Sequence, residues 1–281
     1  MPILVTGATG NVGRHLVGQL AAAGHRVRAL TRDPDAAAFP DGVEAVGGDL
    51  ADPSSLKAAF DGATAVHLLS SHQPANEPPG AGEVALAHAG ELLAMAEQAG
   101  VRRVSVLWTG AQGPVEEAAK QSGLEWTIVQ PGNFMANARL WAEDVRTEGV
   151  VREPFAQVAH YVVHEADIAA VAAAALTGEG HAGKEYTLVG PEGLTVPQQV
   201  AILSQAVGRE IRYEELTEEQ AEDRMRELGM GDEDIDFIVG WNADQANEDR
   251  LAAEAADIAA ITGRPPRAFA QWAAEHADAF R

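Results

Sequence analysis

The sequence predicts an α/β fold: a doubly wound parallel sheet with helices on both faces, followed by a small, mostly helical lobe. In the first half of the chain, short β-rich runs alternate with helical stretches, which is typical of parallel sheets. These runs are apolar without strict alternation, as expected of strands that are covered on both faces. After Pro131 helical patterns dominate. With 281 residues and 46% hydrophobic content, the chain is long enough to bury a large core.

The elements of the predicted sheet follow one another closely. We expect helices at residues 11–24 and 83–100, and strands at residues 2–7, 26–31, 43–50, 63–71, 102–108, 124–131 and 185–191. The last strand lies within the helical second half, so part of that half is expected to return to the sheet. The helix at 83–100 is also a candidate surface for a homodimer, unless the sheet covers its apolar face.

The second half of the chain carries several signals for helices. We expect a helix at 133–145 and a buried helix at 167–176, for which Asp167 is a candidate cap. Two further starts have the spacing of a capping box, in which a threonine accepts an amide hydrogen from the first turn. These starts are Thr195 with Gln198 and Thr217 with Gln220.

Composition excludes several classes of function. A formal net charge of −22 disfavours nucleic acid as a direct ligand, because its phosphate backbone would be repelled. The chain has no cysteine, which excludes disulfides, thiol catalysis and cysteine-ligated zinc. The sequence shows neither a secretory signal nor an apolar run long enough to cross a bilayer. We therefore expect a cytoplasmic protein that acts on a small molecule and binds neither nucleic acid nor membrane.

The stretch VTGATGNVG places three glycines between the first strand and the first helix. The first glycine permits a tight turn, the second lets the backbone approach a pyrophosphate, and the third lets helix and strand pack closely. The helix N-terminus adds amide donors and a positive dipole. This context predicts a Rossmann domain at residues 1–150 that binds a dinucleotide, and a substrate lobe at residues 151–281; a vestigial loop is the alternative. The candidate loop residues are Thr6, Gly7, Thr9, Gly10, Asn11, Val12 and Gly13.

The end of the second strand is expected to select the cofactor. Enzymes that prefer NAD usually place an acid there to bind the ribose 2′-hydroxyl, but this chain has Thr31 followed by Arg32. Arg32 can pair with a 2′-phosphate, which favours NADP over NAD. The alternative is a solvated loop cation whose field Asp33 weakens. Further cofactor contacts are expected where other strands end, at Asp49, Leu50, Leu69, Ser70, Gly132, Asn133 and Phe134; Asp49 is equally suited to cap the next turn.

Several motifs together resemble a known family. The segments TGATGNVG, RDP, GDL, SGLEWTIVQPGNFMAN and HEADIAAVAAAAL…GKEYTLVGPE are similar to the NmrA-like branch of the atypical short-chain dehydrogenases/reductases, including its quinone oxidoreductase-like members. The resemblance covers roughly residues 1–215. It implies a Rossmann domain with a small C-terminal substrate lobe and NADP as the common cofactor. It also implies one of two roles, because the family includes both enzymes and redox-sensing regulators.

The chain departs from the superfamily's usual catalytic pair. Other members protonate a carbonyl oxygen with a tyrosine that a lysine activates, on the helix that here reads GPVEEAAKQSG. The two positions appear as Gln112 and Glu116 in this sequence. Glu116 has a structural explanation, since an acid suits the first turn of a helix and can pair with Lys120 one turn later. The loss favours acceptors that form a delocalised anion, such as quinones and enones, over simple ketones.

Three other side chains are candidates for proton transfer. Thr109 follows the fifth strand, His72 lies near the expected crevice, and Tyr161 belongs to the segment HYVVHEAD. Each has a structural alternative: a hydroxyl that satisfies a loop amide, an exposed loop histidine, and a residue of a lobe strand. His160 and His164 share that last alternative. They do not read as a metal pair, because the β-branched run between them predicts a strand, and we expect no metal site.

The substrate pocket is expected over Gly132, Asn133 and Phe134. Its apolar walls are expected from Trp108, Met135, Trp141, Phe237 and Trp241, although core packing explains each of them as well. Our first hypothesis is an NADPH-dependent reductase that transfers hydride to a quinone-like or conjugated carbonyl compound. The alternative is a non-catalytic NADP-binding sensor of redox state.

Overall fold

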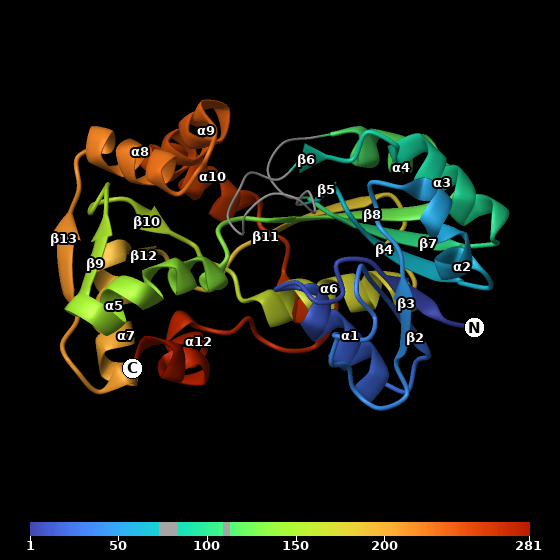
Figure 1. The fold of residues 1–281 in the computed structure, drawn as a ribbon, viewed down its shortest axis with the longest axis horizontal. Helices are drawn as coiled ribbons and strands as arrows, with labels where there is room; N and C mark the ends of the chain where they lie inside the picture. Colours follow the sequence, from blue (N-terminus) through green and yellow to red (C-terminus); the bar gives the residue numbers. More distant parts are fainter. Residues whose placement is uncertain (73–83, 109–112) are drawn as a thin grey trace.

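The computed structural model describes residues 1–72, 84–108 and 113–281, and it confirms the predicted α/β class (Figure 1). A seven-stranded sheet lies at the centre of one half, and its strands have the order β11-β8-β7-β4-β1-β2-β3. All neighbouring strands of this sheet run parallel. The strands are β1 (Ile3–Val5), β2 (Val27–Thr31), β3 (Glu44–Gly47), β4 (Ala65–Leu69), β7 (Arg103–Leu107), β8 (Glu125–Pro131) and β11 (Lys184–Leu188).

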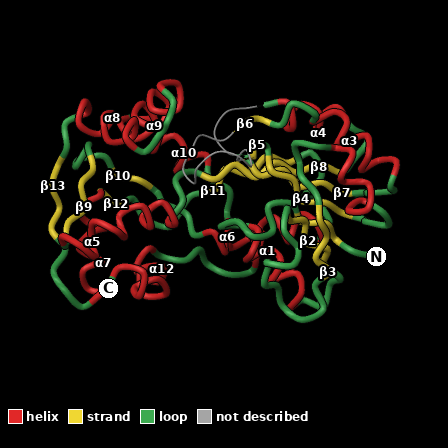
Figure 2. The backbone as a smooth tube through the Cα atoms, in the orientation of Figure 1, coloured by secondary structure: helices red, strands yellow, loops and turns green. Residues whose placement is uncertain are grey.

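Helices cover both faces of the sheet, as Figure 2 shows. On one face, α1 (Gly13–Ala22) and α6 (Glu165–Thr177) bury apolar side chains such as Leu16, Val17 and Ile168. The other face is covered by a short 3-10 turn η1 (Pro53–Leu56), α2 (Lys57–Phe60), α3 (Ala89–Gln98) and α4 (Pro114–Gln121). Because both faces are buried, the strands need no polar side, which explains the apolar runs in the sequence.

The helix that we expected at residues 83–100 is shorter in the structure. It begins at Ala89, and the residues before it form a two-residue strand β6 (Val84–Ala85) that pairs with β5 (Ser71–His72). The helix predicted from the apolar periodicity is therefore confirmed only from residue 89 onward. The backbone groups of residues 84–85 form hydrogen bonds to a neighbouring strand instead. Leu92 and Leu93 of α3 are buried against the sheet. The sheet therefore covers these apolar side chains, as in the alternative to the dimer surface that we considered for this helix.

The other half of the molecule, the C-terminal lobe, has its own core. Aromatic side chains dominate its centre, where Phe269, Trp272 and Phe280 are fully buried. Strand β10 pairs antiparallel with β12, and β13 pairs parallel with β9. The elements are η2 (Met135–Trp141), α5 (Ala142–Glu148), β9 (Val150–Glu153), β10 (Ala159–His160), β12 (Leu194–Thr195), α7 (Val196–Val207), β13 (Arg212–Glu215), α8 (Glu218–Glu227), α9 (Asp232–Ala243), α10 (Gln245–Glu254), α11 (Ile258–Thr262), α12 (Phe269–His276) and η3 (Ala277–Phe280).

The helix starts of the lobe test the capping signals. Both threonine capping boxes are confirmed, at the starts of α7 and α8. The proposed cap of α6 is wrong: the cap is His164, whose ring Nδ1 accepts the amide hydrogen of Ala166. Asp167 instead accepts the amide hydrogen of Arg267 at 2.7 Å and pairs with its guanidinium. The helix expected at 133–145 is split into the 3-10 helix η2 and α5, which continues to Glu148.

The two halves are connected by several passages of the chain rather than by one linker (Figure 1). After β8 the chain enters the lobe, returns to the sheet for α6 and β11, and enters the lobe again at β12. As a result, side chains from distant segments meet where the strands end. No helix in the described part of the chain is both long and apolar enough to cross a membrane.

Candidate functional site

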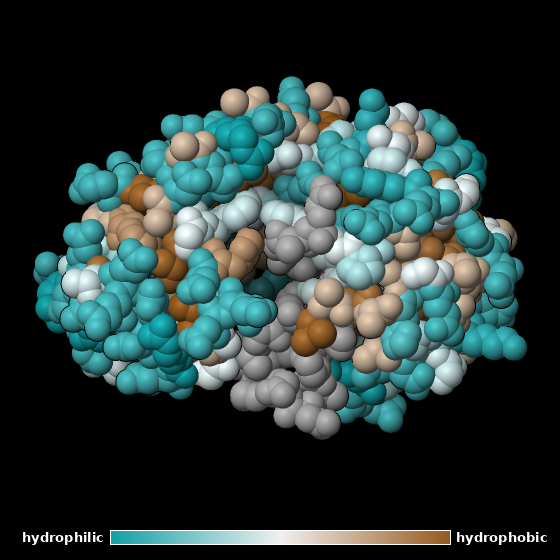
Figure 3. All heavy atoms as spheres, turned by 90° about the horizontal axis from the view of Figure 1, so that it is seen from above, coloured by the Kyte–Doolittle hydropathy of each residue, from teal (hydrophilic) through white to brown (hydrophobic). Residues whose placement is uncertain are grey.

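The candidate site lies where the parallel strands end at their carboxyl termini, between the sheet and the C-terminal lobe. In open α/β sheets this edge is where ligands bind, because loops and helix N-termini converge there. The view from above shows a hollow between the two halves at this place (Figure 3). The ends of β1, β4, β7 and β8 place the candidate site residues around this hollow.

The glycine loop has the geometry that a dinucleotide requires. Gly7 has a φ of 58°, and a Cβ atom there would lie 2.5 Å from Cδ1 of Leu69. A Cβ atom on Gly13 would lie 2.0 Å from the carbonyl oxygen of Gly7, closer than any real side chain allows. The turn is closed by the amide of Gly10, which donates to the same oxygen at 2.9 Å. Backbone atoms therefore leave no room for a side chain at residue 13, and the positive φ favours glycine at residue 7.

The start of α1 offers donors to an anion. Within the described residues, the amides of Asn11, Val12 and Gly13 donate to no backbone carbonyl, and the helix dipole adds positive potential there. Arg14 and Arg139 lie near one another: burial and the charge of Arg139 both lower the pKa of Arg14. Nε of Arg139 is buried with no hydrogen-bond partner among the described residues. These groups fit a pyrophosphate.

The positions expected around the adenine and ribose are less informative. Thr31 ends β2, and its hydroxyl accepts the amide hydrogen of Asp33 at 3.3 Å. Arg32 follows it and is exposed. Asp49 accepts the amide hydrogen of Ala51, which is a structural role, while Asp52 caps η1. Leu50 is buried in the core.

The middle of the site is formed by the ends of β4 and β8. Thr6 accepts the amide hydrogen of Leu69 at 3.2 Å, which fixes the leucine beside Gly7. Ser70 is buried. At the end of β8, Gly132 donates its amide hydrogen to Leu188, and Phe134 packs against the core of the sheet. The structure thus brings the β4, β8 and glycine-loop positions together, while Thr9 and Asn11 are exposed at the rim.

A buried polar cluster, formed by Asn133, His160, Asn242 and Glu248, adjoins the end of β8. The carboxylate of Glu248 is 2% exposed. Its Oε1 lies 3.0 Å from Nδ1 of His160 and accepts from Nδ2 of Asn133 at 3.3 Å. Its Oε2 accepts the amide hydrogen of Tyr161 at 3.1 Å. Asn133 also donates to Oδ1 of Asn242 at 3.2 Å. The carboxylate is therefore surrounded by donors from two separate segments of the chain, as a buried carboxylate requires.

Three aromatic side chains join the sheet to the lobe. Trp241 of α9 lies with its ring 6.0 Å from that of Trp108, at the end of β7, and 5.7 Å from that of Phe237. Phe237 is 46% exposed, and the two tryptophans are partly buried. The other two expected wall residues have structural roles: Met135 is buried in the lobe core, and the indole N–H of Trp141 donates to Glu153 at 2.7 Å.

The candidates for proton transfer have different outcomes. Thr109 and Gln112 lie outside the described residues, as does the side chain of His72, whose backbone belongs to β5. The ring of Tyr161 packs over Gly193 and lines a cavity of about 300 Å³ beyond β11, together with Val189 and Pro191. The expected pair of Glu116 and Lys120 is wrong: Lys120 reaches Glu185 on β11 at 2.8 Å, and Glu116 caps the first turn of α4 through the amide of Gly113.

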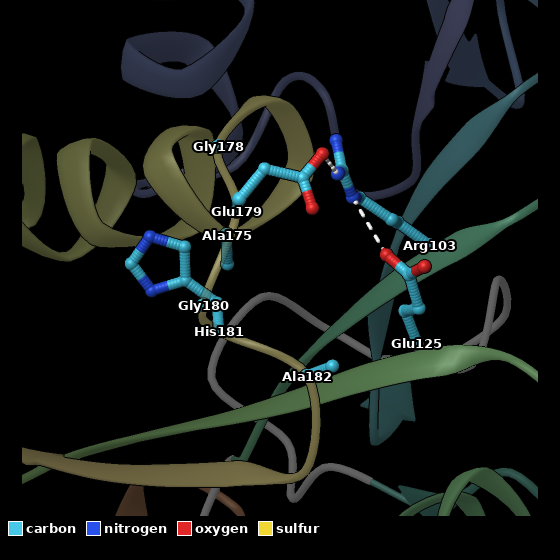
Figure 4. A pocket seen from close by; sticks show the side chains of 8 residues that line it. All are labelled: Arg103, Glu125, Ala175, Gly178, Glu179, Gly180, His181 and Ala182. Carbon is cyan, nitrogen blue, oxygen red and sulfur yellow. Dashed lines mark hydrogen bonds and ion pairs between the residues drawn. The ribbon is translucent and has the colours of Figure 1, made fainter.

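A second cavity, of about 130 Å³, lies at the amino ends of β7 and β8, beside the loop that precedes β11 (Figure 4). Arg103 begins β7 there and Glu125 begins β8. Arg103 donates to Glu125 at 3.0 Å and also pairs with Glu179. Because the arginine already has two carboxylate partners, this cavity offers no free charge to a ligand. Within the described residues, no group of three or more histidine and acidic side chains could hold a metal ion.

Sequence reasoning missed the buried partners of this site. Glu248 and Asn242 lie in acidic helices that read as solvated, and nothing in their spacing distinguishes the one buried acid. Arg139 stands in a segment that was expected to be an ordinary helix. A buried charge becomes visible only when the distant segments meet, so no local signal was available for these residues.

The chain is similar to reductases over nearly its whole length. The chain is 38% identical over 283 residues to the (4-alkanoyl-5-oxo-2,5-dihydrofuran-3-yl)methyl phosphate reductase of Streptomyces griseus, with 99% of each chain covered. It is 35% identical over 293 residues to the NAD(P)H azoreductase of Xenophilus azovorans, again with 99% of each covered.

A solved structure shares the fold over nearly the whole chain. The NADPH-dependent quinone oxidoreductase of Escherichia coli, complexed with NADPH, superposes with a TM-score of 0.72 at 22% identity, covering 97% of this chain and 99% of the other. The model of the NmrA-like family matches residues 1–258. The resemblance seen in the sequence is thus confirmed, and the chain belongs to the NmrA-like family.

Proposed function

We propose that the protein is an NADPH-dependent reductase that transfers hydride to a small conjugated carbonyl compound. The expectation of an NAD(P)H-dependent oxidoreductase is confirmed by the relatives, which are reductases. The substrate of the Streptomyces relative is named as a dihydrofuran with a 5-oxo group, so its ring carbonyl is conjugated with a ring double bond. Such a compound belongs to the acceptor class that the sequence favoured.

The residues of this chain fit the cofactor. When bound, NADPH supplies a hydride to the acceptor. The free amides at the start of α1, together with Arg14 and Arg139, would hold the pyrophosphate. Leu69 and the Gly132–Phe134 segment would border the nicotinamide, because they lie at the ends of β4 and β8. Arg32 is proposed to bind the 2′-phosphate.

The observation that carries the acceptor class is the aromatic wall of Trp108, Trp241 and Phe237. A planar conjugated ring stacks on such side chains, and a hydrophobic wall excludes the water that would compete for the site. The polar cluster adjoins the end of β8 through Asn133, and it would supply polar groups that orient the carbonyl group of an acceptor. Orientation of the acceptor against the cofactor is the main catalytic task of the protein.

The test is the loss of reduced-nicotinamide absorbance when purified protein meets NADPH or NADH with a panel of acceptors. The panel contains an acyl butenolide, a naphthoquinone and cyclohexanone. We expect oxidation of NADPH with the first two compounds, and little with the simple ketone. Tight NADPH binding with no turnover of any acceptor would contradict the proposal and favour the redox sensor.

Trp241→Ala tests the aromatic wall. If the wall binds substrate, KM for the conjugated acceptor rises several-fold, while NADPH affinity and the thermal midpoint stay close to those of the wild type. A loss of stability with unchanged KM would show that Trp241 only packs the lobe against the sheet. Leu228→Ala is a matched control, because Leu228 is another large apolar residue of the lobe but is 57% exposed.

A further inference from the structure

Reduction of a conjugated carbonyl needs a proton as well as a hydride, and the reductase proposed above has no assigned donor. The usual tyrosine of the superfamily is missing from the helix before β8. Tyr161 packs over Gly193 beside the cavity beyond β11. The polar cluster at the end of β8 contains a histidine, His160.

The imidazole of His160 is held in one orientation by a carboxylate. Its Nδ1 lies 3.0 Å from Oε1 of Glu248, and both side chains are almost fully buried, at 8% and 2% exposed. Glu248 comes from α10, 88 residues further along the chain. Since ionised Glu248 can only accept hydrogen bonds, Nδ1 carries a hydrogen and donates it. This fixes which ring nitrogen is left for chemistry.

The second ring nitrogen of His160, Nε2, makes no hydrogen bond within the described residues. An imidazole whose Nδ1–H is bound by a carboxylate while Nε2 makes no hydrogen bond within the described residues is the arrangement of a general acid or base.

Asn133 connects this pair to the place where the acceptor reacts. It follows β8 directly, and its backbone carbonyl accepts the amide hydrogen of Val163, which fixes the segment on both sides. Its side-chain amide donates to Glu248 at 3.3 Å and to Asn242 at 3.2 Å. The carboxylate thus holds the histidine and the strand end in one network.

We propose that His160 is the proton donor of the reductase, held in place by Glu248; this inference rests on the proposed function. The acceptor gains a hydride, and with it two electrons, at the carbon conjugated to its carbonyl, while NADPH is oxidised to NADP⁺. The π electrons of the acceptor move to the carbonyl oxygen and form an enolate. The proton on Nε2 of His160 then passes to the enolate, and the neutral imidazole recovers a proton from solvent.

The decisive variant is His160→Asn, tested with NADPH and the acyl butenolide. We expect kcat to fall by about 100-fold or more, the usual contribution of a general acid, while the dissociation constant of NADPH stays within threefold of the wild type. His25→Asn is the matched control, since His25 is exposed and far from the strand ends. Glu248→Gln keeps the shape of the side chain but removes its charge, and it is expected to lower kcat about tenfold with His160 still present.

Chemical rescue distinguishes a donor from a side chain that only fills space. In His160→Ala, added imidazole is expected to restore turnover in proportion to its concentration, while pyrazole, which has the same shape but is a far weaker base, does not. Equal rescue by both compounds, or kcat of His160→Asn within threefold of the wild type, overturns the proposal. A parallel loss of NADPH binding in His160→Asn also overturns it. If the wild type reduces no acceptor at all, the proposed function itself fails.

Discussion

The glycine loop and the polar cluster are two parts of one site that are built in opposite ways. The loop is a continuous stretch of nine residues whose shape follows from backbone sterics at Gly7 and Gly13. The cluster is assembled from side chains of β10, α9, α10 and the end of β8, with partners up to 115 residues apart. A loop of the first kind can be recognised from its sequence. A cluster of the second kind exists only in the folded chain, and its stability depends on every member.

The largest effect is expected from breaking the cluster at its centre. Glu248→Ala leaves the amide of Tyr161 and the ring N–H of His160 without their acceptor, and it removes one of the two acceptors of the Asn133 side chain. Removing one partner of a buried polar network costs about 3–5 kcal/mol of unfolding free energy. Urea unfolding of wild type and variant measures this loss. A change below 1 kcal/mol would mean that water replaces the carboxylate and that the cluster is not a unit.

Breaking the loop should affect binding first. In Gly13→Ala the new Cβ atom meets the carbonyl oxygen of Gly7 at 2.0 Å, so the backbone must move away from its cofactor-binding shape. We expect NADPH affinity to fall by about 100-fold, or about 2.7 kcal/mol of binding free energy. Isothermal titration calorimetry measures it.

Gly18→Ala is the matched control, since it lies in the same helix with nothing within 4 Å of the new atom. It should keep the NADPH affinity and raise stability by about 0.5–1 kcal/mol. Equal affinities in the two variants would contradict the steric explanation of the loop.

A buried histidine in β4, His67, is expected to make the stability of the protein depend on pH. The backbone carbonyl of His67 in β4 accepts the amide hydrogen of Thr6, and burial of the His67 side chain lowers the pKa of its imidazole from 6.5 to about 4. The unfolded chain therefore binds a proton below pH 6.5 that the folded chain refuses until about pH 4, so the unfolding free energy falls as pH falls through this window. At pH 5 the loss is about 2 kcal/mol.

His67→Gln removes this titration and keeps a partner for the hydroxyl of Ser105, which contacts the ring at 2.6 Å. Urea unfolding at pH 7 and pH 5 should show a smaller decrease in the variant than in the wild type. An unchanged decrease would mean that carboxylates elsewhere account for the whole pH dependence. His25→Gln, at an exposed histidine, should leave it unaltered.

The smallest expected effect concerns the choice of cofactor at Arg32. Arg32→Ala should weaken NADPH binding by about tenfold, or about 1.4 kcal/mol, and leave NADH binding nearly unchanged, because only NADPH carries the 2′-phosphate. Fluorescence titration with both cofactors measures this difference. Equal losses would refute the assignment and would leave the selection of cofactor to other residues.

The comparison also explains which features could be predicted from the sequence. All seven strands of the sheet were recognised, since each is a short apolar run with a turn or helix signal after it. The capping boxes at Thr195 and Thr217 were found because capping is a local hydrogen bond. The cap of α6 was missed, because the sequence offered the carboxylate of Asp167 as a cap, whereas the folded chain uses a ring nitrogen of His164.

The failures in the site have a common physical cause. Glu248 was indistinguishable from the other acids around it, since its burial depends on α10 folding over the end of β8. The partner of Lys120 was predicted one helical turn away, whereas the folded chain brings Glu185 of the neighbouring strand closer. Local spacing predicts the neighbours of a side chain along its own element, but not those from another element.

The repeated passage of the chain between the two halves limits how such a protein can be recombined. Strand β11 forms the edge of the sheet, and α11 packs on α6, yet both are encoded among segments of the C-terminal lobe. A chimera that takes its acceptor specificity from a relative therefore cannot be made at one junction. The lobe must be grafted as several pieces, each joined where the chain passes between the sheet and the lobe. Otherwise the grafted segment brings the relative's β11 into the sheet of this protein.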